Sequence, residues 1–372
     1  MTEYLQNLSE SLRAYGVDKP VAVVDLDRLD ANCALAVDGS DDGLDRRLVA
    51  KSLPCRPLLD HIRGLIQTSG LMTFSEPMLL ALLQAEPKTD HLIGKPLPVS
   101  SAARVLSECP DAAARVQWLI DSSERLQSYL ALAADRQLAL RLSLEVDIGL
   151  HRGGFQPDQV ARIAQEIEAT PNARLSGVMG YEAHLAKLPG FLRKRAVQSS
   201  ADAFDRAVSG LPNEAKGLCL NTGGSLTFQS YRATGKATEV AFGSILVKPT
   251  DFDHKTTQGF QPAAFIATPV LKTMPGNSLP GLDFLARRKT DLAIFGGYFR
   301  AKPVFPNGFG YSSIFGRSTN QEVWTGPPNA PVNPGDIALL RPCQSEAVLN
   351  QFGIVLAVRG GQVVDEWECL PN

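Results

Sequence analysis

The chain has a lysine, Lys51, within an apolar segment where burying its charged ammonium group would cost free energy. Lys51 lies in the apolar run of residues 47–53, which has the pattern of a short buried strand and ends before Pro54. Burial disfavours the charged ammonium group and lowers the pKa of a lysine, and the neutral amine is the form that attacks a carbonyl group. Lys51 is therefore a candidate for imine formation. The alternative is a lysine whose head group reaches solvent at the strand end.

Two short segments have the composition of phosphate-binding turns: Thr222, Gly223, Gly224 and Ser225, and further along Gly243 and Ser244. Consecutive glycines let backbone N–H groups turn toward one anion. The first segment follows a predicted strand and the second lies in or after the last one, late in a βα series, where barrel enzymes commonly bind phosphate. We interpret the two segments as one phosphate site, with ordinary turns as the alternative.

Three further side chains complete a possible ligand site. Arg152 is surrounded by glycines that give it close access to a ligand's oxygens, although a salt bridge with Glu145 or Asp147 is the structural alternative. Tyr181 and His184 follow a predicted strand, and a core aromatic and a surface histidine are their structural alternatives. An imine-forming lysine, phosphate turns and an oriented arginine together describe pyridoxal 5'-phosphate (PLP), whose ring takes up the electrons of a carbanion.

Strands and helices alternate between residues 27 and 248. The predicted strands are 49–53, 116–120, 138–146, 175–180, 217–220 and 239–247, and the predicted helices are 57–65, 123–136, 157–168 and 191–209. About eight βα units fit an α/β fold of the (β/α)8 barrel type better than an open doubly wound sheet. In such a barrel the candidate residues lie at the C-terminal ends of the strands, where barrel enzymes place their chemistry.

The sequence pattern changes after Pro249. Short apolar runs at 262–272, 291–295, 336–340, 353–358 and 362–367 alternate with turns at 334–335 and 360–361. This pattern predicts an all-β C-terminal domain. The strand expected at residues 21–24 could pair with it. The predicted domains are a barrel at 26–250 and a β domain at 251–372 together with 1–25.

Composition excludes several classes of protein. With 372 residues, 44% of them hydrophobic, the chain is long enough for two domains, and its net charge of −2 gives no support for nucleic-acid or membrane binding. Six scattered cysteines without a CxxC pair indicate reduced thiols. We see no signal peptide and no apolar segment of the ~20 residues that a membrane span needs. A cytoplasmic enzyme is expected.

The order and spacing of the motifs resemble a known family. The segments are 50–51, 146–154, 180–184, 223–225 and 239–244, with 335–336 to 363–367 in the β domain. Together they look like the D-threonine aldolase / D-serine dehydratase family, fold-type III PLP enzymes related to alanine racemase, and the likeness covers nearly the whole chain. It implies a homodimer.

The resemblance also implies roles for single residues. Lys51 would link covalently to PLP, Arg152 would contact the ring oxygen, and Tyr181 would lie near the ring. His184 would match the family's base on the substrate's β-hydroxyl. The phosphate would be bound by Gly224, Ser225, Gly243 and Ser244.

One motif departs from the family pattern. Members with a divalent metal usually bind it through Pro-x-His-x-Cys or Pro-x-His-x-Asp, whereas this chain has Gln344 and Glu346 at those places after Pro342. All five histidines precede this motif, the last of them being His254. An amide and a carboxylate suit a hard ion such as Mg²⁺ or Mn²⁺ better than zinc. The metal is therefore either changed or lost, and an ordinary polar turn is the remaining alternative.

The resemblance favours a PLP-dependent lyase that acts on a small-molecule substrate, a β-hydroxy D-amino acid, by retro-aldol cleavage. Dehydration of D-serine or a related 3-hydroxy-D-amino acid is the first alternative. An amino-acid racemase is the second, with Tyr181 or a residue of a partner subunit as the second acid/base. A non-catalytic PLP carrier is the third, and the large β domain argues against it because carriers resemble the barrel alone.

Overall fold

A computed structural model describes residues 2–38, 43–211, 215–231, 235–275, 281 and 288–372. The chain forms two compact units. The first, here called the β unit, comprises Met1–Leu35, Pro54–Leu58 and Ser244–Cys369, and the second, the barrel unit, comprises Ala36–Leu53, Leu59–Gly243 and Leu370–Asn372. The domain limits given above remain predictions.

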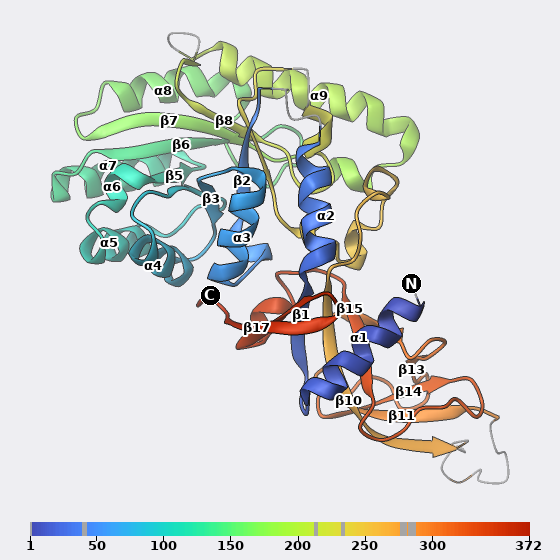
Figure 1. Ribbon diagram of the computed structural model, residues 1–372. Coiled ribbons are helices and arrows are strands. Elements are labelled where there is room, and N and C mark those ends of the chain that lie inside the picture. The colour runs from blue at the N-terminus through green and yellow to red at the C-terminus, as the bar shows by residue number, and fades with distance from the viewer. Residues whose placement is uncertain (1, 39–42, 212–214, 232–234, 276–280, 282–287) are drawn as a thin grey trace. The chain divides into compact units, whose positions relative to one another are not determined.

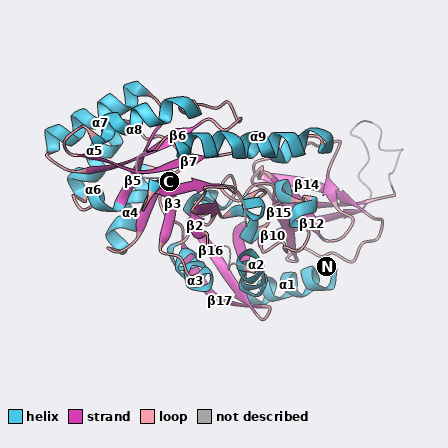
Figure 2. Cartoon of the chain, turned by 90° about the horizontal axis from the view of Figure 1, so that it is seen from above, coloured by secondary structure: helices cyan, strands magenta, loops and turns pink. Residues whose placement is uncertain are grey.

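The barrel unit contains a closed barrel of eight parallel strands (Figures 1 and 2). They are β2 (Asp45–Val49), β3 (Gly70–Thr73), β4 (Asp90–Ile93), β5 (Val116–Ile120), β6 (Leu140–Val146), β7 (Ala173–Gly180), β8 (Cys219–Thr222) and β9 (Glu239–Phe242). Each strand pairs with its successor, and β9 pairs in parallel with β2 to close the ring. The predicted (β/α)8 barrel is thereby confirmed.

Helices lie outside these strands (Figure 1). They are α3 (Arg56–Ile66), α4 (Glu76–Ala85), α5 (Val99–Glu108), α6 (Ala112–Arg115), α7 (Ser123–Arg136), α8 (Val160–Glu168) and α9 (Gly190–Ser209). In α8 the buried positions Val160, Ile163, Ala164 and Ile167 follow the helical repeat. They pack into one core cluster with strand residues such as Trp118.

Several predicted strands end earlier than expected. β2 stops at Val49, where its pairing with β3 ends, and Lys51 lies in the 3-10 turn η1 (Ala50–Ser52) rather than in a strand. β9 likewise ends at Phe242, and α10 (Ser244–Val247) follows where a strand to 247 was predicted. In both places apolar residues continue past the last residue that pairs with a neighbouring strand, and a turn or short helix buries them. A prediction based on hydrophobicity therefore extended both strands too far.

The β unit contains one nine-stranded sheet. Its strands are β1 (Val21–Asp25), β10 (Ala264–Pro275), β11 (Thr290–Phe295), β12 (Ala301–Phe305), β13 (Gly310–Tyr311), β14 (Gln321–Gly326), β15 (Ile337–Pro342), β16 (Ile354–Arg359) and β17 (Gln362–Glu368). The N-terminal strand β1 lies between β10, which is antiparallel to it, and β16, which is parallel. Its predicted pairing with the β domain is confirmed. Gly360 and Gly361, with φ of 56° and 73°, form the predicted turn between β16 and β17.

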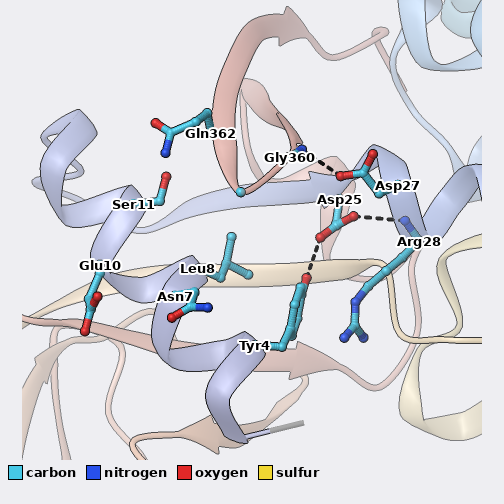
Figure 3. A pocket seen from close by; sticks show the side chains of 11 residues that line it. Tyr4, Asn7, Leu8, Glu10, Ser11, Asp25, Asp27, Arg28, Gly360 and Gln362 are labelled. Atoms are coloured by element: carbon cyan, nitrogen blue, oxygen red, sulfur yellow. Dashed lines mark hydrogen bonds between the residues drawn. The ribbon is translucent and has the colours of Figure 1, made fainter.

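The sequence analysis missed helix α1 (Thr2–Tyr15), although Leu5, Leu8 and Leu12 recur at helical spacing and are buried. Asp25 then begins α2 (Leu26–Val37): its carboxylate accepts the Arg28 N–H at 2.9 Å and the Tyr4 hydroxyl at 2.7 Å (Figure 3). A hollow of about 630 Å³ separates α1 from the β16–β17 turn. The buried carboxylate that lines this hollow, Asp25, is thus already hydrogen-bonded within the protein.

The remaining short elements are the 3-10 turns η2 (Pro157–Gln159), η3 (Ala183–Lys187), η5 (Phe228–Tyr231), η6 (Thr250–Phe252), η7 (Lys255–Thr257) and η8 (Leu349–Gln351). In the described part of the chain, no helix is both long enough and apolar enough to cross a membrane.

Candidate active site

The candidate residues of the barrel unit lie at one rim of the barrel. Five strands that are consecutive around the ring, β6, β7, β8, β9 and β2, carry them at or just beyond their C-terminal ends. The residues in that order are Arg152, Tyr181 with His184, Thr222 with Gly223, Gly224 and Ser225, Gly243, and Lys51. Because all strands are parallel, these ends share the face on which barrel enzymes place their chemistry.

Lys51 is placed by two close contacts that the sequence analysis missed. Its Nζ atom lies 4.2 Å from the centre of the Phe74 ring, and Phe74 follows β3 directly. The ring packs on Gly94, where an added Cβ would come within 2.3 Å of it. A Cβ at Gly243 would meet the Val49 carbonyl oxygen at 2.8 Å, so glycine lets the end of β9 approach the turn that contains Lys51. No strand was predicted before Phe74, so the sequence carried no local signal for this contact.

The two glycine segments meet at the ends of β8 and β9. Gly223 has φ of +83°, which glycine adopts readily, and the Gly243 N–H donates to the Ser225 hydroxyl at 3.5 Å. Thr222 is fully buried at the end of β8. The segments therefore form one small glycine-lined surface rather than two separate turns, as a shared phosphate site requires.

Tyr181 and Arg152 adjoin this surface. A Cβ on Gly224 would lie 2.8 Å from Cε2 of Tyr181, so the tyrosine ring rests directly on the glycine backbone. The Arg152 guanidinium carbon lies 5.4 Å from the centre of that ring, within the range of a cation–π contact. Within the described residues, no ion pair joins Arg152 to Glu145 or Asp147.

Asp147 instead organises the loop after β6. Its carboxylate accepts the N–H groups of Gly149 at 2.9 Å and His151 at 3.0 Å, and it pairs with Nδ1 of His151 at 2.8 Å. Burial opposes its ionisation, but these hydrogen bonds outweigh that effect and lower the pKa of Asp147. Asp147 thereby shapes the loop from which Arg152 projects.

His184 lies across from this loop in η3. A Cβ on Gly149 would approach its ring to 3.3 Å, so the two rim loops are in contact here. Burial and the nearby His151 lower the pKa of His184, which favours the neutral ring. Its Nδ1 atom is buried and finds no hydrogen-bond partner among the described residues. A neutral imidazole with an unsatisfied nitrogen can accept a proton from a ligand hydroxyl.

Two more buried polar groups lie at this rim without a role assigned from the sequence. Thr73 ends β3, and its buried hydroxyl has no partner within the described chain. Glu182 is fully buried next to Tyr181 and accepts hydrogen bonds from the Thr222 and Thr227 hydroxyls. A negatively charged carboxylate is not expected beside a phosphate site, so no function was predicted for Glu182 from the sequence.

The remaining candidates lie in the β unit. The Ser244 hydroxyl donates to Glu346 at 3.3 Å, and the Ser345 hydroxyl donates to Ser244 at 2.9 Å. Gln344 is half-buried in the same turn. Among the described residues, no three His, Cys, Asp or Glu side chains gather as a metal site. The metal-binding role of Gln344 and Glu346 remains a prediction.

Known proteins of similar structure share this architecture. D-threonine aldolase from Filomicrobium marinum matches with a TM-score of 0.78 at 17% identity, covering 94% of this chain and 96% of that one. D-threo-3-hydroxyaspartate dehydratase from Delftia sp. HT23 gives 0.77 at 18% identity over 96% and 98%. Alanine racemase from Clostridium difficile 630 gives 0.73 at 16% identity over 94% and 98%. At these identities the matches establish the fold.

No curated protein matches the chain in sequence. The sequence pattern of the family described as "Alanine racemase, N-terminal domain" matches residues 59–251, more than half of the chain, including every rim candidate except Lys51. With the closed barrel and the separate β unit in place, the chain belongs to the alanine racemase N-terminal domain family.

Proposed function

We propose that this protein is a PLP-dependent lyase that cleaves β-hydroxy D-amino acids by a retro-aldol reaction. The observation that carries the proposal is the single arc of rim residues, with an amine at Lys51, a glycine-lined anion surface at the ends of β8 and β9, and a neutral histidine at position 184. Family membership and the names of the structurally similar aldolase and dehydratase support the same chemistry.

The rim residues fit PLP. Lys51 supplies the amine for the cofactor's aldehyde, and the turn of Gly223, Gly224 and Ser225 with Gly243 supplies donors for the phosphate. Tyr181 rests on this turn and Arg152 lies beside Tyr181, and both would contact the ring in this proposal. The unpaired Thr73 hydroxyl and His184 Nδ1 are buried polar atoms of the kind that a bound polar group satisfies. When bound, PLP supplies an electron sink for the bond broken at the substrate's α-carbon.

His184 performs the proton transfer in this proposal. Its neutral imidazole takes the proton from the substrate's β-hydroxyl as the Cα–Cβ bond breaks, and it returns a proton after cleavage. Burial keeps the ring in the accepting form by lowering its pKa. In the dehydration alternative, the amine of Lys51, which lies on the same rim, would take the α-proton instead.

A divalent ion at Gln344 and Glu346 is a separate part of the proposal. One carboxylate and one amide are enough protein ligands for Mg²⁺ or Mn²⁺ only if water or substrate completes the coordination shell. Glu346 is meanwhile hydrogen-bonded by Ser244 and Ser345. An ion bound there would act as a Lewis acid on the substrate's β-hydroxyl, in addition to the proton transfer assigned to His184.

Dehydration is the second candidate, because the dehydratase matches with nearly the same TM-score as the aldolase. Racemisation is the third, since Tyr181 lies on the rim as a possible second acid. We further propose a homodimer in the cytoplasm. Symmetric dimers are the commonest homo-oligomers, and Phe191 at the start of α9, 83% accessible, is one exposed aromatic at which association can be probed.

Product analysis distinguishes the three reactions. Purified protein is incubated with PLP and D-threonine, D-serine or D-alanine, with and without EDTA. Aldolase activity yields glycine and acetaldehyde from D-threonine, dehydration yields a keto acid and ammonia, and racemisation yields the L-enantiomer. The proposal expects the first pattern and its loss in Lys51→Ala. Keto acid or L-enantiomer as the main product would replace the aldolase assignment.

A further inference from the structure

Glu182 connects both ends of the glycine turn after β8. Its Oε2 accepts the Thr222 hydroxyl at 3.1 Å, and its Oε1 accepts the Thr227 hydroxyl. Thr222 precedes the turn and Thr227 follows it, so one carboxylate fixes the two ends of residues 223–226. The Thr227 N–H also donates to the Gly224 carbonyl at 2.9 Å, which closes the turn from within.

Burying the carboxyl group of Glu182 costs free energy, and the hydrogen bonds that offset this cost show what holds the residue in place. Its side chain is 0% exposed. Burial raises the pKa of Glu182, whereas hydrogen bonds from Thr227, Thr222, Tyr231 and the Gly223 N–H favour its ionised form. A buried carboxyl group is tolerated only where such donors surround it. These donors all belong to the glycine turn or its flanks, so the energetic cost of burying Glu182 is offset only while the turn keeps this shape.

We propose that Glu182 is a positioning residue that fixes the turn of Gly223, Gly224 and Ser225 in the conformation that receives the phosphate of PLP. The neighbouring Tyr181 rests on Gly224 from the exposed side, while Glu182 is bonded to the turn from the buried side. This inference rests on the proposed function, because it takes PLP as the ligand. Glu182 contacts no ligand itself.

The test compares PLP with pyridoxal, which lacks only the phosphate. Full-length apo-protein is titrated with each ligand, and binding is followed by absorbance and tryptophan fluorescence. Glu182→Ala is expected to weaken PLP binding at least ~10-fold and pyridoxal binding less than ~3-fold, because a lost hydrogen-bond network on the turn affects phosphate recognition alone. Thr227→Val removes one donor and should give a smaller loss in the same direction.

Glu239→Gln is the matched control. Glu239 is also a buried barrel carboxylate, but it lies at the opposite end of β9 and accepts from Arg47 at 2.6 Å and Asn221 at 2.6 Å. This variant should lower thermal stability without changing the ratio of PLP to pyridoxal affinity. Equal losses for both ligands in Glu182→Ala and Thr227→Val, or no loss, would refute the positioning role while leaving the proposed function intact. A wild-type protein that binds no PLP would overturn both.

A second inference rests on a thiol pair in the β unit. Cys55 and Cys369 face each other in an isolated antiparallel β-bridge, with their sulfur atoms 3.8 Å apart. Cys55 is buried and Cys369 is half-buried. The hydrogen bond from Cys55 lowers the pKa of Cys369, although burial opposes this effect. Facing residues of antiparallel pairs have Cα atoms about 4.5–5.5 Å apart, which lies within the range for disulfides.

We infer that Cys55 and Cys369 form a disulfide when the protein meets hydrogen peroxide. The Cys369 thiolate attacks one peroxide oxygen, the O–O bond breaks, and a sulfenic acid and hydroxide result. The Cys55 thiol then attacks the Cys369 sulfur, the S–S bond forms, and the hydroxyl leaves with the thiol proton as water. Two thiols are oxidised by two electrons as the peroxide is reduced. The bond ties the segment after Lys51 to the C-terminal strand.

Thiol titration and peptide mapping test this inference. The native chain has six thiols, and peroxide should leave four (six minus the two in one disulfide) together with a cross-linked peptide containing Cys55 and Cys369. Cys55→Ser and Cys369→Ser should each lose the cross-link, while Cys109→Ser should keep it. A cross-link between other cysteines, or oxidation of Cys369 to sulfinic acid with Cys55 still reduced in the native chain, would overturn it.

Discussion

His184 owes its assigned role to its surroundings at the barrel rim. Gly149 lets the loop after β6 come close to its ring, and burial keeps that ring neutral. Asp147 orders the same loop by accepting three hydrogen bonds. The base and the loop that carries Arg152 are thus arranged together, and a change at His184 itself should alter catalysis before it alters cofactor binding.

Replacing His184 tests this arrangement. His184→Gln should reduce kcat about 10²-fold or more, the usual contribution of a general base, while cofactor absorbance persists. Because the base must be unprotonated and its pKa is lowered, the wild-type enzyme should retain activity below pH 6.5 and lose it only at lower pH. A pH–rate profile of both proteins is the measurement, and His61→Gln is the control. Unchanged kcat in His184→Gln would assign the proton transfer to another group.

Replacing Glu346 tests the prediction that Gln344 and Glu346 bind a metal ion. If an ion binds at Gln344 and Glu346, Glu346→Ala removes its only charged protein ligand, and activity should fall at least about tenfold with cofactor absorbance unchanged. Mg²⁺ or Mn²⁺ should restore EDTA-treated wild-type enzyme but not this variant. Full activity after EDTA, with no metal found by elemental analysis, would leave the turn as a polar contact of another kind.

At the scale of single elements, strand β4 carries an unusual residue. His91 is fully buried, and neither ring nitrogen finds a partner among the described residues. Burial, followed by repulsion from Arg115 and Arg47, lowers the pKa of His91 to about 3. The folded protein therefore excludes a proton that the unfolded chain accepts below its ordinary pKa of about 6.5.

This difference predicts acid sensitivity of the barrel. Stability is fully present above pH 6.5 and should fall as the pH drops from there toward 3, by at most about 1.4 kcal/mol per pH unit from this residue. His91→Leu removes the titrating ring without breaking a hydrogen bond, so its thermal midpoint should fall less between pH 7 and pH 5 than that of the wild type. Equal shifts in both proteins would show that His91 does not control this dependence.

Element boundaries show what the sequence could and could not predict. The strand Val116–Ile120 and the helix Ser123–Arg136 were predicted with the correct ends, because an apolar run is followed by Ser122, whose hydroxyl accepts the Arg125 N–H. The four-residue strands β3 and β4 were not identified, since their identity depends on neighbours in the barrel. The turn at Lys51 was assigned to a strand for the same reason.

The candidate site also contains residues that the sequence could predict and residues that it could not. Lysine, glycine turns and histidine have recognisable chemistry, and the parallel barrel brings their segments to one rim as expected. Phe74 and Glu182 depend on contacts with residues distant in sequence, through Gly94 and Thr227. No local pattern encodes such contacts, so these two residues required the structure.

At the scale of the whole molecule, the chain combines a barrel unit and a β unit that each have their own core. The proposed homodimer is tested by light scattering coupled to size-exclusion chromatography. A mass of twice the 40.1 kDa chain is expected. Phe191→Asp, on exposed α9, is a useful probe of whether that helix contributes. A monomer with full activity at micromolar concentration would contradict the dimer.

The covalent link to the cofactor is the central claim, and mapping it is the most direct test. Borohydride treatment of the PLP-loaded protein, followed by proteolysis and mass spectrometry, should place the reduced pyridoxyl group on Lys51. Lys248 is the informative competitor, because burial lowers its pKa, although its Nζ donates to the Phe260 carbonyl at 2.7 Å. Lys51→Ala should lose the covalent adduct and still bind PLP through the glycine turn. An adduct on Lys248 or any other lysine, or none at all, would contradict the account.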